Sequence, residues 1–200
     1  MNIFEAIEQR RAVKTFDADY KMSDQDIETV LSMARLSPTA YNQQNYRFVV
    51  IKDPALRELI KSAANGQAQC TDASLLVILC ADTKAWEKHG LFYWGNAEPD
   101  MQQLKKNAMT SYYINRELAQ RDEAMRSCGL AAQIMMLTAK GLNLDSCPMI
   151  GFDFDAVAKL IKLPADHVIG LMVAIGKSRK PALPRFPQLP DDEIIFTDTF

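Results

Sequence analysis

Apolar and polar residues follow two different periods along this chain, and these periods separate the expected helices from the expected strands. Ile3, Phe4 and Ile7 have helical spacing and predict a short amphipathic helix whose last turn carries Arg10 and Arg11. The same kind of spacing, with capping residues and prolines at the boundaries, predicts further helices over residues 23–37, 53–63, 121–140 and 153–163.

The strands are predicted from apolar runs. The run LLVILC at residues 75–80 is continuous and predicts a strand that is buried on both faces. Residues 46–51, 143–147 and 168–175 predict three more strands, and a strand-like EIIFT at 193–197 follows a proline-rich stretch. Because these strands and helices do not alternate strictly, the pattern favours an α+β fold.

The segment of residues 83–109 is the hardest to assign. It holds both tryptophans, Trp86 and Trp94, together with Phe92 and Tyr93. Two interpretations stay open: these aromatic residues are core or dimer contacts, or they form a lid over a ligand site. No linker or internal repeat divides the sequence, so we expect a single domain over residues 1–200 with an extended arm from about residue 181.

Composition excludes several classes of protein. With 23 basic and 25 acidic residues, the chain has no overall field to attract nucleic acid. The longest apolar run, at residues 74–81, is too short to cross a membrane, and no signal peptide is recognisable. The four cysteines are scattered without a C-x-x-C pair, which favours reduced, packed thiols and a cytoplasmic location.

The usual catalytic motifs are missing. The sequence contains no G-x-G-x-x-G, no P-loop and no G-x-S-x-G elbow, and its two histidines, His89 and His167, are too few and too far apart for most metal sites. No metal is therefore expected. An enzyme without these side chains takes its chemistry from a cofactor.

Two polar segments suggest what that cofactor is. Arg10, Arg11 and Lys14 place three cations within five residues, and on a continuing helix Arg10 and Lys14 would share a face and meet one anion. The amide-rich turn SPTAYNQQ at residues 37–44 leads directly into a predicted strand. Cations on one segment and amides on another suit a ligand with an anionic end and a flat polar ring.

In these segments the chain resembles the FMN-dependent nitroreductase family. The matching motifs, in the family's order, are RRAVKTF at 10–16, SPTAYNQQ at 37–44 and CPMIGFD at 147–153, the last followed by a helix and a core strand that ends in glycine. The resemblance implies a nitroreductase-like fold, with a central mixed sheet flanked by helices and a C-terminal strand exchanged with the partner subunit. Asn45 and Tyr46 replace the family's usual Pro-Trp pair.

The resemblance also implies roles for individual residues. Arg10 would hold the FMN phosphate, and Lys14 would reach the pyrimidine edge of the ring, while backbone N–H groups of Ile150 and Gly151 would meet the hydride-accepting nitrogen. Family members often have serine at the position of Ala12; Arg11 either compensates for its absence or is only a surface charge. The implied cofactor contacts are Arg10, Arg11, Lys14, Pro38, Thr39, Ala40, Asn42, Gln44, Gln67, Gln69, Pro148, Met149, Ile150, Gly151, Arg179 and Arg185. Two points stay open: Gln67 and Gln69 are either ring contacts or exposed loop amides, and Lys177, Arg179 and Arg185 compete for one phosphate contact, with Arg179 and Arg185 favoured.

The implied activity is an FMN-dependent oxidoreductase that uses NADH or NADPH. The flavin carries the chemistry, so no catalytic side chain is expected, and a nitroaromatic, quinone or similar small molecule would accept the electrons in a ping-pong cycle. The implied assembly is a homodimer with FMN at the interface, in which the turn at 37–44 serves the site of the partner. Two alternatives stay open: an FMN carrier or redox sensor with little turnover, and a dimeric module that binds a phosphate ligand without redox chemistry.

Overall fold

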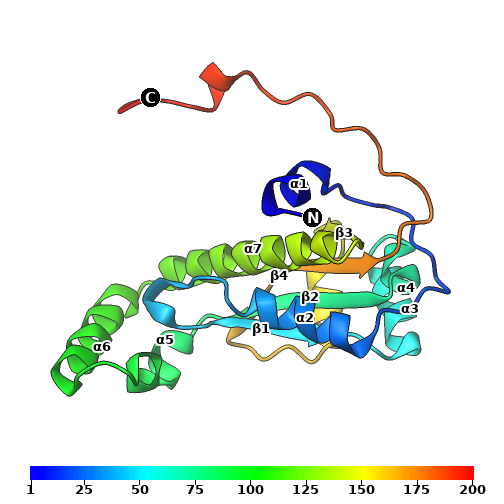
Figure 1. Ribbon diagram of the computed structural model, residues 1–200. Coiled ribbons are helices and arrows are strands. Elements are labelled where there is room, and N and C mark those ends of the chain that lie inside the picture. Colours follow the sequence, from blue (N-terminus) through cyan, green and yellow to red (C-terminus); the bar gives the residue numbers. More distant parts are fainter.

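A computed structural model describes all 200 residues. Its centre is a four-stranded sheet of β1 (Tyr46–Val50), β2 (Leu75–Asp82), β3 (Asp145–Met149) and β4 (His167–Gly176), in the order β1-β2-β4-β3 (Figure 1). All neighbouring strands run antiparallel, so the expectation of a mixed sheet is wrong for the four strands of one chain. A single parallel bridge, Ala12 to Ser146, lies outside the named strands.

Helices cover both faces of this sheet, because β2 alternates its side chains between two apolar clusters. Leu75, Val77 and Leu79 pack with helices α2 (Asp24–Ala34) and α7 (Glu117–Gly141), whereas Leu76 and Ile78 pack with α3 (Pro54–Ala63) and α8 (Phe154–Leu160). All eight residues of β2 are buried, as the apolar run predicted. The α+β fold is therefore a three-layer arrangement with β2 and β4 at its centre.

Capping residues begin four of the helices, and three of these helices, α2, α3 and α8, begin where the sequence predicted a cap. The side chains of Asn2, Ser23, Asp53 and Asp153 accept backbone N–H groups at the starts of α1 (Ile3–Gln9), α2, α3 and α8. The remaining elements are the helices α4 (Gln69–Asp72), α5 (Ala85–Lys88) and α6 (Pro99–Tyr113), and the 3₁₀ turns η1 (Ala40–Asn42), η2 (Gly90–Trp94) and η3 (Asp191–Glu193).

The first helix is shorter than predicted. Helix α1 ends at Gln9, and Arg10 has ψ 129°, which is extended backbone. Val13 N–H donates to Ser146 O at 3.0 Å, and burial of Val13 fixes this segment along the outer edge of β3. Arg10 and Lys14 thus lie on an extended segment, and the prediction that they share a helical face is wrong.

Residues 83–116 form a separate helical segment at the far end of the sheet from α3 and α4 (Figure 1). Trp86, Tyr93, Met109 and Tyr113 are buried together in a small cluster of their own, while Phe92 is 76% exposed. The aromatic residues therefore divide: Trp86 and Tyr93 are core residues of this segment, Trp94 packs against them half-buried, and Phe92 lies at the surface.

The chain after β4 leaves the body as an extended arm (Figure 1). Its strand-like segment, residues 193–197, forms no strand in the single chain. The 3₁₀ turn η3 ends at Glu193. The next three residues, Ile194, Ile195 and Phe196, are all exposed. No helix of the chain has the length and apolar character needed to span a membrane.

Candidate functional site

The structure brings three of the predicted arginines together at the end of α1. Arg11 Nη1 donates to Glu8 O at 2.5 Å and to Arg10 O at 3.0 Å, and Arg185 Nη2 donates to Glu8 O at 3.2 Å. Arg11 and Arg185 therefore stabilise the negative end of the α1 dipole. The side chain of Arg10 takes part in none of the chain's hydrogen bonds or ion pairs, which leaves its guanidinium free for a ligand.

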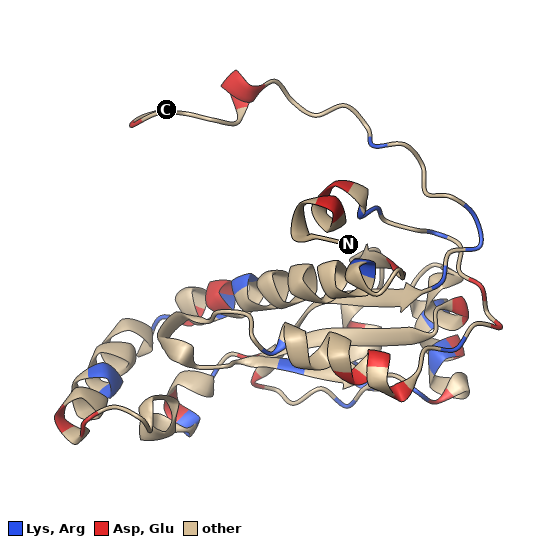
Figure 2. Cartoon of the chain, in the orientation of Figure 1, with Lys and Arg blue, Asp and Glu red and all other residues tan.

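No carboxylate neutralises these arginines, since none of the ion pairs in the chain includes Arg10, Arg11 or Arg185. Burial, followed by the charges of Arg185 and Arg11, lowers the pKa of Arg10. Figure 2 shows basic residues both on the segment after α1 and on the outgoing arm. An incoming anion such as a phosphate would relieve the repulsion between these charges.

Lys14 and Arg179 lie further along the same edge. Lys14 lies between two isolated bridges of this segment, Ala12 to Ser146 of β3 and Phe16 to Ser178 just after β4. Arg179 N–H donates to Thr15 O at 3.0 Å, so this arginine lies beside the Lys14 segment, whereas Arg185 reaches the arginines at α1.

The chain just after β3 presents two adjacent backbone donors. Ile150 is 70% exposed and Gly151 is also exposed, and neither N–H donates a hydrogen bond within the chain. Gly151 O accepts from Asn65 Nδ2 at 3.1 Å and from Gln67 Nε2 at 2.9 Å, which fixes the orientation of this peptide. Gly151 does not have a positive φ, and a Cβ at this position would make only an ordinary contact with Gln67 Nε2 at 3.6 Å, so the backbone of the chain alone does not require glycine here.

The remaining members of this group lie beneath the two donors. Met149 is buried, and Pro148 precedes it in β3. Gln69 is also buried, and its amide lies 4.0 Å from the sulfur of Cys147 in the same strand. Gln67 is thus bonded to the carbonyl of Gly151, and Gln69 supports the strand below it.

The turn at residues 38–44 lies at the other end of the molecule, beside α6 and the start of α7 (Figure 1). Ala40 N–H donates to Glu123 Oε1 at 3.2 Å, whereas Arg11 and Lys140 line one hollow of about 420 Å³. At 1.5 Å per residue, the helix between Glu123 and Lys140 is about 25 Å long. One chain therefore does not bring its turn to its own arginines.

Within the turn, Thr39 and Asn42 make the main side-chain hydrogen bonds. Thr39 Oγ1 accepts Gln44 N–H at 3.0 Å, and Asn42 Nδ2 donates to Tyr93 O at 2.9 Å. Pro38, Asn42 and Gln44 are exposed, and Gln44 Nε2 donates to Asn42 Oδ1 at 3.4 Å.

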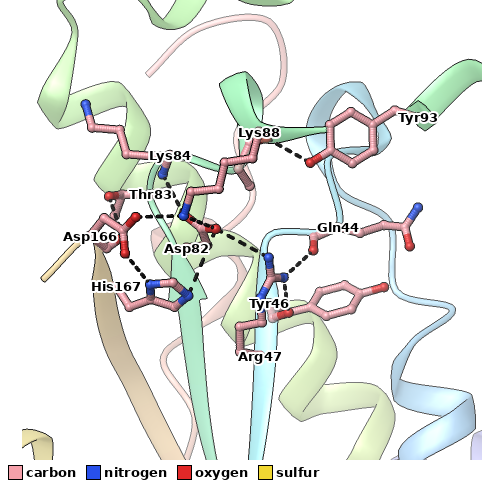
Figure 3. Close-up of polar contacts among 11 residues, drawn as sticks. Gln44, Tyr46, Arg47, Asp82, Thr83, Lys84, Lys88, Tyr93, Asp166 and His167 are labelled. Atoms are coloured by element: carbon pink, nitrogen blue, oxygen red, sulfur yellow. Dashed lines mark hydrogen bonds and ion pairs between the residues drawn. The ribbon is translucent and has the colours of Figure 1, made fainter. Parts of the chain in front are cut away.

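A polar cluster that the sequence did not indicate lies near this end of the sheet (Figure 3). Lys88 Nζ lies 2.7 Å from Asp82 Oδ2 and 2.6 Å from Asp166 Oδ2, and His167 Nδ1 lies 2.7 Å from Asp166 Oδ1. Arg47 also contacts Asp82, at 3.3 Å. The ammonium group of Lys88 supplies the positive charge between the two carboxylates, so this cluster fastens α5 to the ends of β2 and β4.

Sequence reasoning missed several residues near the predicted contacts. Asn65 bonds to Gly151 O, and Gln43, Tyr113 and Glu123 hold the turn from the inside. Each of these hydrogen bonds joins residues that are 70 to 86 positions apart in the sequence. Such contacts form only when long loops close, and no local pattern of residues indicates them.

Comparison with known proteins places this geometry in a family. The sequence model of the Nitroreductase family matches residues 7–177, which is most of the chain. The chain belongs to the Nitroreductase family. It is 47% identical over 182 residues to protein DrgA of Synechocystis sp., covering 91% of this chain and 87% of DrgA.

Two further relatives agree with this membership. MhqN of Bacillus subtilis, provisionally named an NAD(P)H nitroreductase, is 30% identical over 179 residues, covering 86% of this chain and 87% of MhqN. A provisionally named nitroreductase of Exiguobacterium sibiricum, solved in complex with FMN, superposes with a TM-score of 0.90 at 24% identity, covering 99% of this chain and 98% of that one. The nitroreductase fold thus extends over nearly the whole chain.

Proposed function

We propose that this protein is an FMN-dependent NAD(P)H oxidoreductase that reduces nitroaromatics, quinones or similar small acceptors in a ping-pong cycle. The observation that carries the proposal is the pair of free N–H groups of Ile150 and Gly151, on the same edge of the sheet as a group of arginines without carboxylate partners. The FMN complex of the Exiguobacterium sibiricum protein and the NAD(P)H in the name of MhqN support it.

The residues at this edge fit the parts of an FMN molecule. Arg10, with Arg11 and Arg185 beside it, would bind the phosphate through charge-assisted hydrogen bonds. The Ile150 and Gly151 N–H groups would donate to an acceptor atom of the ring, and any side chain at position 150 is compatible with this because the donor is backbone. The exposed ammonium of Lys14 would stabilise negative charge at the pyrimidine edge.

Bound FMN would supply the redox chemistry, taking electrons from NADH or NADPH and passing them to the acceptor. The chain itself would bind and orient the cofactor and place a positive charge where negative charge develops. Residues 38–44 would complete the site from a second copy of the chain, because in one chain they lie at the opposite end of α7 from Arg11. The proposed functional unit is therefore a homodimer with FMN at its interface.

Absorbance spectra of the purified protein test this function. We expect a flavin spectrum that NADH or NADPH bleaches in the absence of oxygen and that a quinone or nitroaromatic then restores. A flavin spectrum without rapid bleaching would indicate the carrier or sensor instead. Protein that stays colourless after incubation with FMN would instead support the module that binds a phosphate ligand without redox chemistry.

A further inference from the structure

The turn that contains the predicted FMN contacts has an unusual backbone. Tyr41, Asn42 and Gln44 have φ values of 54°, 54° and 42°, in the left-handed region that residues with a Cβ rarely occupy. Such a conformation persists only when the surrounding structure holds it in place. Residues outside the turn therefore have to determine its shape.

Gln43 connects the interior of the turn to α6. Its side chain is only 3% exposed, although its neighbours Asn42 and Gln44 are exposed. Gln43 Nε2 donates to the hydroxyl of Tyr113 at 3.1 Å, and Tyr113 is itself 1% exposed. Desolvation by burial, followed by the charge of Glu123, raises the pKa of Tyr113 to about 12, so the hydroxyl stays neutral at physiological pH.

Other contacts to the turn also come from the helical segment of residues 83–116. Asn42 Nδ2 donates to the backbone carbonyl of Tyr93 in η2, and the ring of Tyr41 packs edge-on against Tyr113 with centroids 6.0 Å apart. Tyr93 in turn donates its hydroxyl to Ala85 O at 2.8 Å, which ties η2 to α5. The strained backbone is thus fastened to two elements of one segment.

We propose that Gln43 and Tyr113 are positioning residues that set the shape of the turn at residues 39–44 for FMN binding. This inference rests on the proposed function. Neither residue touches the cofactor: the buried Gln43–Tyr113 hydrogen bond holds the exposed Asn42 and Gln44 in the geometry in which they meet it. Loss of this hydrogen bond frees the turn to leave its left-handed conformation, so part of the binding energy of FMN is spent on restoring it.

Tyr113→Phe tests the inference, because it removes one hydroxyl and keeps the buried ring. Tyr112→Phe is the matched control, since Tyr112 is 40% exposed and its hydroxyl makes no hydrogen bond in the chain. The measurement is the Kd of FMN for the apoprotein, from quenching of flavin fluorescence, beside the melting temperature of the same apoprotein. We expect Tyr113→Phe to raise Kd about fivefold, the effect of one neutral hydrogen bond, and Tyr112→Phe to leave it unchanged.

Gln43→Met removes the other partner at similar side-chain length and provides a second route if Tyr113→Phe does not fold. Gln43→Met should raise Kd to a similar extent, and the double variant should be no weaker than either single variant, because all three lack the same bond. If wild type, Tyr113→Phe and Gln43→Met all bind FMN with the same Kd, the positioning role is refuted and the proposed function stands. Additive losses in the double variant also refute the positioning role, and a wild type that binds no FMN refutes the proposed function instead.

Discussion

Arg10 differs from its two arginine neighbours in having a free guanidinium. Arg11 and Arg185 donate to carbonyls at the end of α1, and the side chain of Arg10 makes no such bond. This difference assigns the arginines separate tasks. Arg10 would make the direct phosphate contact, and the other two would keep the local potential positive.

Arg10→Ala should therefore weaken FMN binding by about 2 kcal/mol, or roughly thirtyfold in Kd, because it removes a charge-assisted hydrogen bond to the phosphate. Arg11→Ala alone should have a smaller effect, and the double variant should bind FMN most weakly. Titration of the apoproteins with FMN measures these values. Lys180→Ala, an exposed cation on the arm, serves as the control, and an unchanged Kd in the double variant would refute the phosphate assignment.

The positions of single residues were predictable from the sequence where they depend only on the nearby end of a helix or strand. Ile150 and Gly151 follow directly after β3 and are exposed, and the half-buried Arg10 follows α1, so the ends of these two elements place all three residues. The burial of Gln43 could not be predicted in this way, because it depends on Tyr113, which is 70 residues away. A hydrogen bond between residues so far apart in the sequence cannot be predicted from the local pattern of apolar residues.

At the scale of elements, the Lys88 cluster explains how the helical segment of residues 83–116 is attached to the sheet. Asp82 is a buried carboxylate at the end of β2, and Lys88 in α5 bridges it to Asp166, which precedes β4 (Figure 3). Hydrogen bonds from Lys88 and then from His167 lower the pKa of Asp166 to about 2. Because its folded-state pKa is depressed, Asp166 stabilises the fold above the ordinary carboxyl pKa of 3.8.

Asp166→Asn should lower the melting temperature near pH 7 by about 2 °C, since a partly exposed ion pair contributes less than about 1 kcal/mol. The difference between variant and wild type should then disappear as the pH falls from about 4 to about 2 and wild-type Asp166 takes up its proton. Thermal melts across this range measure it. Asp122→Asn, at an exposed position without an ion pair, is the control variant. A constant difference between Asp166→Asn and wild type down to pH 2 would contradict the pKa argument.

The bounds of most elements were predictable because capping residues and apolar runs mark them, as at Asp53 and in β2. Two predictions at this scale were wrong for one physical reason. Ala12 and Val13 pair with β3, and this tertiary contact overrides the helical continuation that spacing alone suggested for Arg10 and Lys14. Strand direction also depends on such pairings, so the antiparallel order of the sheet could not be inferred from local pattern.

At the scale of the whole molecule, two segments expose apolar side chains that nothing in the chain covers. Phe4 of α1 is 74% exposed, and Ile194 and Ile195 in the arm are 57% and 67% exposed. Apolar side chains exposed in this way are available to pack against a second chain. The sheet has open edges for such an arm, because β1 pairs on one side only and β4 pairs with β3 only from Met172 onward.

Removal of residues 188–200 should therefore weaken both dimerisation and FMN retention, while Arg185 remains in place. Light scattering and flavin absorbance measure the two effects, and the full-length variant Asp191→Ala, which keeps the apolar residues of the arm, is the control. A shortened protein that stays dimeric and yellow would show that the arm is a dispensable surface segment.

The separation of the turn from the arginines along α7 leads to a prediction for dimers of two different chains. If each site takes its arginines from one chain and its turn from the other, a chain with Arg10→Ala and Arg11→Ala can complement a chain with Asn42→Ala and Gln44→Ala. In the mixed dimer one site carries all the defects, and the other combines an intact arginine group with an intact turn.

We therefore expect mixed dimers, isolated with two different affinity tags, to bind one FMN with wild-type affinity, whereas each parent homodimer binds FMN weakly at both sites. Isothermal titration gives the stoichiometry and the affinity together. A mixed dimer of wild type with the arginine variant is the reference, and it should also show one strong site. If both sites of the doubly defective mixed dimer are weak, the arginines and the turn of one chain act in the same site, and the shared-site proposal is refuted. The structure argues against that outcome, because the helix between Glu123, beside the turn, and Lys140, beside the arginines, is about 25 Å long.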